Sequence, residues 1–146
     1  MKSYYLAHPL NMRKEIREWE LGFEKRTKIN LFNPFYDADE RRDIYLMDKG
    51  ILIPRTMKSK LEGLKIVNRD LKAIEKQDGI ICLINTQKES FGTPMELFYN
   101  SRILQRNSYI VTSEMGGHPW IKGLSTKIFK NKENLEKYFK RRNKRI

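Results

Sequence analysis

The apolar run at residues 80–84, Ile-Ile-Cys-Leu-Ile, constrains the fold of this chain more than any other stretch. Asp78 and Gly79 precede it and Asn85 follows it, so the run has the length of a strand and not of a helix. Continuous apolar character is typical of a strand that is buried on both faces, as in a parallel sheet covered by helices. We therefore expect residues 80–84 to form the central strand of an α/β protein.

Strand and helix patterns alternate around this central strand. The expected strands are 3–7, 29–32, 80–84, 108–112 and 127–129, and the expected helices are 12–25, 61–76, 94–105 and 133–142. Residues 37–58 are expected to form a long loop with one helical turn near 44–47, and residues 116–119 a turn. The alternation predicts a three-layer α/β sandwich, whose five-stranded, mostly parallel sheet has the flavodoxin-like or Rossmann-like order 2-1-3-4-5.

The chain of 146 residues is expected to form a single domain with a basic C-terminal helix and tail at about 133–146. No apolar run approaches the roughly 20 residues of a membrane span, and the first residues do not have the pattern of a signal peptide. The single cysteine, Cys82, is expected in the core. These features predict a cytoplasmic protein with no membrane association. We expect no metal and no cofactor, because neither metal-ligand spacing nor a nucleotide-binding fingerprint occurs.

The net charge of +12 comes from 30 Lys and Arg against 18 Asp and Glu. A basic surface attracts phosphate, so small phosphorylated ligands and nucleic acid are both candidate partners. The cations are spread along the chain, and the dense run at 137–145 has the pattern of a solvated helix end. No zinc finger, RNP sequence or basic zipper is present, and a nucleic-acid partner is therefore not favoured.

The loop after the central strand leads into a helix that carries a carboxylate in its first turn. Thr93, Pro94 and Glu96 match a capping box, with Thr93 as the N-cap and Glu96 at the third helical position. In the order 2-1-3-4-5 the switch point lies between strands 1 and 3, where loops 8–11 and 86–96 would meet. An ionised carboxylate held there could also attack the anomeric carbon of a sugar. We therefore consider two roles for Glu96, as part of a helix cap and as a nucleophile.

Several segments together resemble the nucleoside 2-deoxyribosyltransferase family. Residues 4–10 resemble its opening strand and loop, residues 68–71 and 78–81 its acid-bearing helix and central strand, and residues 92–97 its loop with the catalytic glutamate. The resemblance implies cleavage of the N-glycosidic bond of a (deoxy)nucleoside or nucleoside monophosphate through a glycosyl-enzyme intermediate. The glycosyl group would pass to another base or to water. The resemblance also implies a homo-oligomer.

The family's residue roles carry over to matching positions of this chain. Glu96 would be the nucleophile, Asp70 would contact and help protonate the base, and Tyr5 would position the nucleophile. Alternatively, Asp70 is a solvated helix acid and Tyr5 a core aromatic residue. The candidate substrate-binding residues, from the matched motifs and from the loops after strands 1 and 2, are Ala7, His8, Asp37, Ser90, Gly92, Thr93 and Met95.

Ser90 leaves the substrate and the acceptor open. The transferases often carry an acid two residues before the glycine of this loop, whereas related nucleotide N-hydrolases have a serine that helps bind a 5′-phosphate. The first loop of this chain, 8–11, lacks the glycines of those hydrolases. Transfer and hydrolysis therefore both remain. The alternatives are a non-enzymatic module that binds a nucleotide or nucleic acid, and a glycohydrolase of NAD or of a nucleotide signal.

Overall fold

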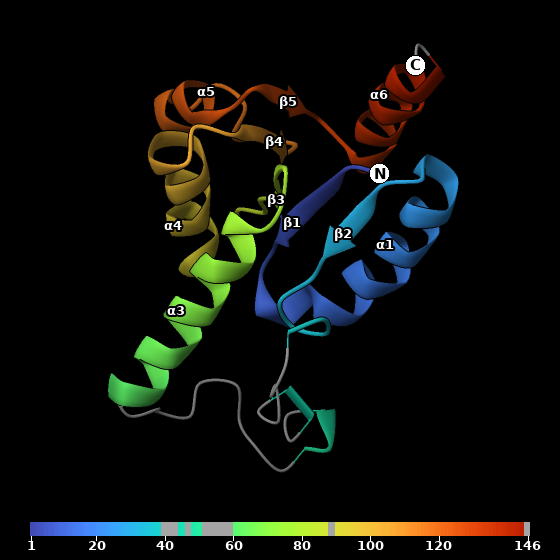
Figure 1. The fold of residues 1–146 in the computed structure, drawn as a ribbon. Coiled ribbons are helices and arrows are strands. Elements are labelled where there is room, and N and C mark those ends of the chain that lie inside the picture. The colour runs from blue at the N-terminus through green and yellow to red at the C-terminus, as the bar shows by residue number, and fades with distance from the viewer. Residues whose placement is uncertain (39–43, 46–47, 51–59, 88–89, 145–146) are drawn as a thin grey trace.

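The computed structural model describes residues 1–38, 44–45, 48–50, 60–87 and 90–144 (Figure 1). Its strands form one five-stranded sheet in the order β2-β1-β3-β4-β5. In chain order they are β1 Ser3–Ala7, β2 Asn30–Phe32, β3 Gly79–Leu83, β4 Asn107–Val111 and β5 Lys127–Phe129. Every neighbouring pair is parallel. The predicted α/β class and strand order are confirmed, and the described sheet is parallel throughout.

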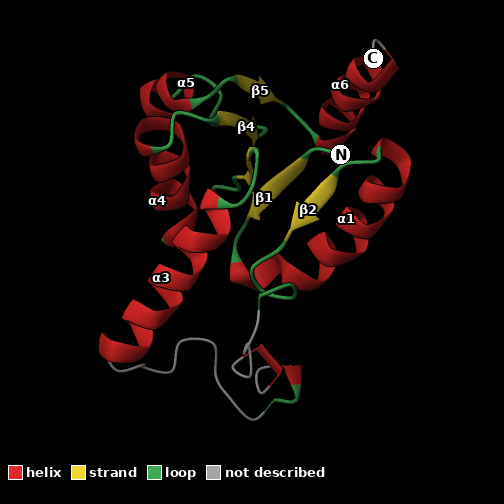
Figure 2. Cartoon of the chain, in the orientation of Figure 1, coloured by secondary structure: helices red, strands yellow, loops and turns green. Residues whose placement is uncertain are grey.

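Helices cover both faces of the sheet, which gives the three layers (Figure 2). One face carries α1 Arg13–Thr27 and α6 Lys132–Lys144, and the other carries α3 Lys60–Glu75, α4 Gly92–Phe98 and α5 Pro119–Leu124. The short 3₁₀ segment η1 Leu10–Met12 precedes α1, and the π-helical turn η2 Tyr99–Ile103 continues α4. Of the described helices, none has the length and apolar character needed to span a bilayer.

Alternation along the central strands divides the core in two. Tyr4 and Leu6 of β1 pack among side chains of α1 and α6, whereas Tyr5 and Ala7 face α3, α4 and α5. All five residues of β3 are buried, as the apolar run predicts. Cys82 is a free, buried cysteine on this strand, and its expected place in the core is confirmed.

Helix α5 is a correction to the sequence-based assignment, which predicted only a turn at 116–119 before the last strand. Strands β4 and β5 are parallel, and parallel neighbours need a crossover connection. Helix α5 forms part of that connection. Its start is marked by the His118 side chain, which accepts a hydrogen bond from the Trp120 N–H at 3.2 Å, and by Pro119 in the first turn.

The predicted helix at 94–105 differs from the structure at both ends. Helix α4 begins at Gly92, so Thr93 lies inside it and the capping-box assignment is wrong. The Thr93 N–H instead donates to the Ser90 hydroxyl at 3.4 Å. At the other end the chain widens into η2 and reaches Gln105 with a positive φ of 55°.

The long segment expected at 37–58 is described only in part. Ile44, Tyr45 and Asp48 are helical, and Ile44 is buried. Asp48 accepts a charged hydrogen bond from Arg13 of α1 at 2.6 Å. The rest of the predicted helical turn and residues 51–58 lie outside the described residues, as does the end of the basic tail at 145–146.

Candidate active site

A cavity of about 550 Å³ opens at the carboxyl edge of the sheet. Its walls come from the loops that follow β1 and β2, from α3, and from the segment that runs through α4 into η2, all of which lie near one another in Figure 1. Seven of the ten predicted site residues line it, namely His8, Asp70, Ser90, Gly92, Thr93, Met95 and Glu96. This is the edge at which ligands bind in open α/β sheets.

Glu96 is half-buried on α4, and its carboxylate is held by Tyr5. The Tyr5 hydroxyl donates a hydrogen bond to Oε2 of Glu96. Tyr5 is fully buried in β1, and its ring stacks on that of Phe32 with centroids 6.0 Å apart. A Cβ atom added to Gly92 would lie 3.6 Å from Oε1 of Glu96, so the loop backbone passes close to the second carboxylate oxygen. The carboxylate is therefore fixed on one oxygen and borders the cavity.

Cys82 of β3 lies beneath this carboxylate. Burial raises the pKa of its thiol well above the usual value, and the negative charge of Glu96 raises it further. The thiol is therefore uncharged at neutral pH and belongs to the apolar core behind the site.

Asp70 enters the cavity from α3, opposite the sheet. Its side chain is only 19 % exposed, which does not fit a freely solvated helix acid. Oδ1 lies 3.6 Å from Nε of the neighbouring Arg69. The cavity thus brings together two carboxylates that are 26 positions apart in the sequence, on different helices, as the positions of Asp70 and Glu96 show.

His8 follows β1 and is buried beside the cavity. Its Nδ1 lies 2.9 Å from the Pro9 carbonyl oxygen, which can only accept, so Nδ1 carries the proton. Burial lowers the pKa of His8, although contributions from the Pro9 carbonyl and the Asn33 side chain act in the opposite direction. The imidazole is thus neutral at physiological pH, and its ring packs on Phe35 with centroids 4.9 Å apart.

The loop into α4 supplies a polar corner and an apolar rim. The Ser90 hydroxyl donates to that of Thr93 at 2.6 Å, and Thr93 is buried. Phe91 and Met95 are 84 % and 61 % exposed, although both line the cavity. Residues 88–89 of the same loop lie outside the described residues.

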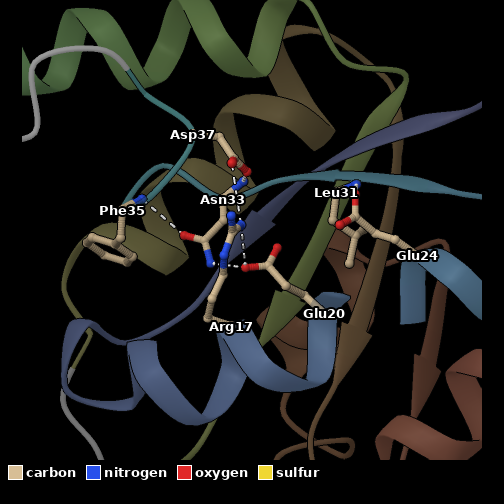
Figure 3. A network of polar contacts seen from close by, with 7 residues as sticks. All are labelled: Arg17, Glu20, Glu24, Leu31, Asn33, Phe35 and Asp37. Atoms are coloured by element: carbon tan, nitrogen blue, oxygen red, sulfur yellow. Dashed lines mark hydrogen bonds and ion pairs between the residues drawn. The ribbon is translucent and has the colours of Figure 1, made fainter. Parts of the chain in front are cut away.

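Three predicted residues lie outside the cavity wall. Tyr5 lies behind it and contacts Glu96 through its hydroxyl. Ala7 is buried in β1 and pairs with Cys82 of β3, so it does not line the cavity. Asp37 is bound elsewhere: its carboxylate accepts from the backbone N–H of Asn33 at 2.8 Å and from Arg17 at 3.4 Å (Figure 3).

Sequence reasoning missed the aromatic and apolar part of the wall. Pro34 and Phe35 line the cavity, whereas the sequence prediction selected Asp37 from the same loop because of its charge. The available signal was position, since the loop after strand 2 borders the switch point in the order 2-1-3-4-5. Helix α3 and η2 add Val67 and Ile103, which are 51 % and 61 % exposed.

The charge of the cavity is opposite to that of the chain. Among the described residues that line it, Asp70 and Glu96 are acidic and none is Lys or Arg. Cations gather instead at a separate hollow of about 370 Å³ on β5 and α6, which Lys127, Lys130, Lys137 and Arg141 border. Within the described parts of the chain, no three His, Cys, Asp or Glu side chains gather as metal ligands would.

Fold and site define a parallel α/β protein with a tyrosine-bound carboxylate at the switch point of its sheet. No protein-family model matches the sequence, and no curated protein matches it significantly. The structure is similar to that of a 2-deoxyribosyltransferase from the psychrotolerant bacterium Bacillus psychrosaccharolyticus, with a TM-score of 0.69 and 18 % identity over 93 % of this chain and 91 % of that one. It is also similar to a conserved protein from Enterococcus faecalis V583, with a TM-score of 0.64 and 12 % identity over 97 % and 99 %. The likeness of fold that the sequence resemblance implies is confirmed.

Proposed function

We propose that this chain cleaves the N-glycosidic bond of a nucleoside with Glu96 as nucleophile and passes the glycosyl group to another base or to water. The observation that carries the proposal is the Glu96 carboxylate, held by the Tyr5 hydroxyl at the wall of a cavity that also contains Asp70. The cavity of about 550 Å³ falls in the size range of small-molecule sites. The fold likeness to a 2-deoxyribosyltransferase supports the same class of reaction.

The reaction would be a double displacement. An oxygen of Glu96 forms a bond to C1′ while the C1′–N bond breaks and its electron pair leaves with the base. Asp70, in its protonated form, gives its proton to that base. An acceptor base or water then attacks C1′ and releases Glu96. The proton that the acceptor or the water loses passes to Asp70. Two inversions leave the configuration at C1′ unchanged.

Tyr5 would position the nucleophile. Its hydroxyl occupies one carboxylate oxygen and restricts rotation of the Glu96 side chain, so that the other oxygen is presented to the sugar. The buried ring of Tyr5 stacks on Phe32, and its backbone pairs with β3. The position of the Tyr5 hydroxyl is therefore set by the sheet and not by the loops.

The charge of the cavity favours an uncharged nucleoside over a nucleoside monophosphate. Among the described lining residues no Lys or Arg faces the ligand, so a 5′-phosphate would meet the negative charge of Glu96 and no cation to balance it. The Ser90 hydroxyl, which the hydrolase comparison suggested as a phosphate ligand, already donates to Thr93. We also infer a homo-oligomer, from the apolar surface that α3, α4 and α5 leave exposed.

Base release from 2′-deoxynucleosides tests the proposal. The protein is incubated with 2′-deoxyadenosine or thymidine, with and without a free acceptor base, and the products are separated by chromatography. Glu96→Ala is expected to lower turnover by on the order of 10³-fold or more, because no other group replaces the covalent step. Glu75→Ala is the matched control, since Glu75 also accepts from a tyrosine hydroxyl, that of Tyr99, but does not line the cavity.

The same assay separates the remaining choices. Base release only with an acceptor identifies a transferase, and release in water alone identifies a hydrolase. Deoxynucleoside 5′-monophosphates are expected to react more slowly than deoxynucleosides. Undiminished turnover by Glu96→Ala would refute the assignment of the nucleophile.

A further inference from the structure

The turn that follows β2 is closed by hydrogen bonds to one residue, Asn33. This side chain is fully buried, and its Oδ1 accepts from the Phe35 N–H at 3.0 Å. Its carbonyl accepts from the N–H groups of Tyr36 at 3.1 Å and Asp37 at 2.8 Å, and its own N–H donates to Asp37 at 2.8 Å. The turn carries Pro34 and Phe35 into the cavity wall.

Helix α1 holds this turn from below through Glu20 (Figure 3). Oε1 of Glu20 accepts from Nδ2 of Asn33 at 2.8 Å and from Arg17 at 3.1 Å. Glu20 is fully buried, and its second oxygen has no hydrogen-bond partner among the described residues. Arg17 also reaches Asp37 at 3.4 Å and lies 5.0 Å from the centroid of the Tyr36 ring.

We propose that Glu20 and Asn33 form a positioning pair that holds Pro34 and Phe35 of the cavity wall against His8 and so determines the affinity for the nucleoside. The inference rests on the proposed function for its substrate. Neither residue lines the cavity, so both act through neighbours: the turn, and for Asn33 also His8. A buried asparagine that donates to a buried carboxylate and accepts from the turn backbone favours one arrangement of the turn.

The geometry separates this pair from the reacting groups. Glu96 is held by Tyr5, which lies in β1, and Asp70 lies on α3, so neither depends on the turn after β2. Loss of the Glu20 carboxylate would leave the Asn33 amide buried without its acceptor. The turn would then shift, and the packing of Phe35 on His8, with centroids 4.9 Å apart, would loosen. Ground-state binding should suffer more than the chemical step.

Helix α1 supplies a matched control one turn further on. Glu24 also accepts a hydrogen bond from the β2 segment, from the Leu31 N–H at 3.0 Å, but not from the turn that lines the cavity. Figure 3 shows both carboxylates on the same helix. Each variant thus removes one carboxylate of α1. Glu20→Ala removes the link to the turn after β2, and Glu24→Ala removes the link to β2 itself.

The kinetic test compares these variants on 2′-deoxyadenosine with an acceptor base. Glu20→Ala is expected to raise KM about tenfold while kcat stays within about threefold. Glu24→Ala should leave KM unchanged. Glu20→Gln keeps an acceptor oxygen for Asn33 and should restore KM to within about threefold of the wild type. Equal KM for all variants, or an equal rise in Glu20→Ala and Glu24→Ala, would overturn the proposal.

Amide hydrogen exchange tests the anchoring without any turnover. In Glu20→Ala the amides of Phe35, Tyr36 and Asp37 are expected to exchange faster, and in Glu24→Ala they should keep the wild-type rate. A wild type that cleaves no nucleoside would refute the proposed function, whereas exchange would still decide the anchoring. Unchanged exchange at all three amides in Glu20→Ala would overturn the proposal that Glu20 anchors the turn.

Discussion

The Tyr5 hydroxyl and the Glu96 carboxylate meet although 91 positions separate them in the sequence. Tyr5 is at the centre of the sheet, where its backbone pairs with β2 on one side and β3 on the other. A hydrogen bond to a charged group contributes roughly 1.5–3 kcal/mol and also fixes geometry. The alternative role of Tyr5 as a core aromatic and its proposed role beside Glu96 are therefore not exclusive: the ring is in the core and the hydroxyl reaches the Glu96 carboxylate.

Glu20 is the buried acid that sequence reasoning did not select. The buried positions of α1 are Ile16, Glu20, Phe23 and Thr27, which share one face of the helix. The nearby apolar residue Leu21, by contrast, is 45 % exposed. The signal was present in the spacing, since a carboxylate four residues after Ile16 and three before Phe23 must point into the core.

Burial raises the pKa of Glu20 to about 7, although the hydrogen bonds from Asn33 and Arg17 oppose this. The charged and titratable groups that face it are Arg17 on its own helix, and Tyr36 and Asp37 on the turn after β2. Because the folded-state pKa lies above the unfolded value, the folded state binds the proton more tightly. The corresponding stability is present below about pH 4.5 and is lost as the pH rises through about 7.

Glu20→Gln should therefore flatten the pH dependence of stability. Between pH 4.5 and 8 the free energy of unfolding of the wild type is expected to fall, relative to that of the variant, by on the order of 3 kcal/mol, since one pKa unit corresponds to about 1.4 kcal/mol. Urea unfolding at a series of pH values measures both curves. Parallel curves would show that Glu20 titrates at an ordinary pKa.

Among the helices and strands, those with a long or strongly apolar sequence pattern could be predicted, and the short ones without such a pattern could not. The strands were predicted within one or two residues because each is a short run with apolar residues between turn-forming residues. Helix α5 was missed because it has only six residues, begins with Pro119 and includes Gly123, so it lacks the repeated apolar spacing of a longer helix. The π-helical turn η2 has no sequence signal of this kind.

The glycine that starts β3 shows how closely the central strands pack. A Cβ atom at Gly79 would lie 2.4 Å from the carbonyl oxygen of Asn107 and 3.1 Å from the Tyr4 ring. Neither neighbour can move freely, because one is backbone of β4 and the other is a buried ring of β1. The sequence shows a strand boundary at Gly79 but not this contact.

Gly79→Ala is therefore expected to destabilise the protein by about 2 kcal/mol or more, as overpacked cores do. Gly63→Ala in α3 is the control, because nothing lies within 4 Å of an added Cβ there. That variant should gain about 0.5–1 kcal/mol from the higher helix propensity of alanine. Urea unfolding measures both. A neutral Gly79→Ala would mean that β3 and β4 can separate slightly at their start.

For the whole molecule, the strand order could be predicted because one run, 80–84, had to be central and the crossover rule limited the rest. The order in turn predicted the edge at which the site lies. What could not be predicted is the lining of the cavity, since it depends on which side chains of four loops and helices converge. Phe35 and Val67 carry no pattern that separates them from ordinary apolar residues.

The face made by α3, α4 and α5 carries apolar side chains that are exposed and do not pack into the core. Leu64 and Val67 of α3 are 52 % and 51 % exposed. A second hollow of about 470 Å³ adjoins the cavity, shares Met95 and Phe98 with it, and extends to Trp120 of α5. Large contiguous apolar surface of this kind marks interaction sites. The opposite face, with α1 and α6, is rich in charge.

A second copy of the chain is the occupant that the proposed homo-oligomer requires on this face. Light scattering after size exclusion should then give a mass that is a multiple of 17.5 kDa. Trp120→Glu, at a position that is 64 % exposed, is expected to shift the mass toward the monomer, because a charge would be buried without a partner in the interface. Leu21→Glu on α1 is the matched control and should leave the mass unchanged. A wild type of 17.5 kDa at micromolar concentration would refute the oligomer, and the exposed rim of Phe91, Met95 and Phe98 would then face solvent beside the cavity mouth.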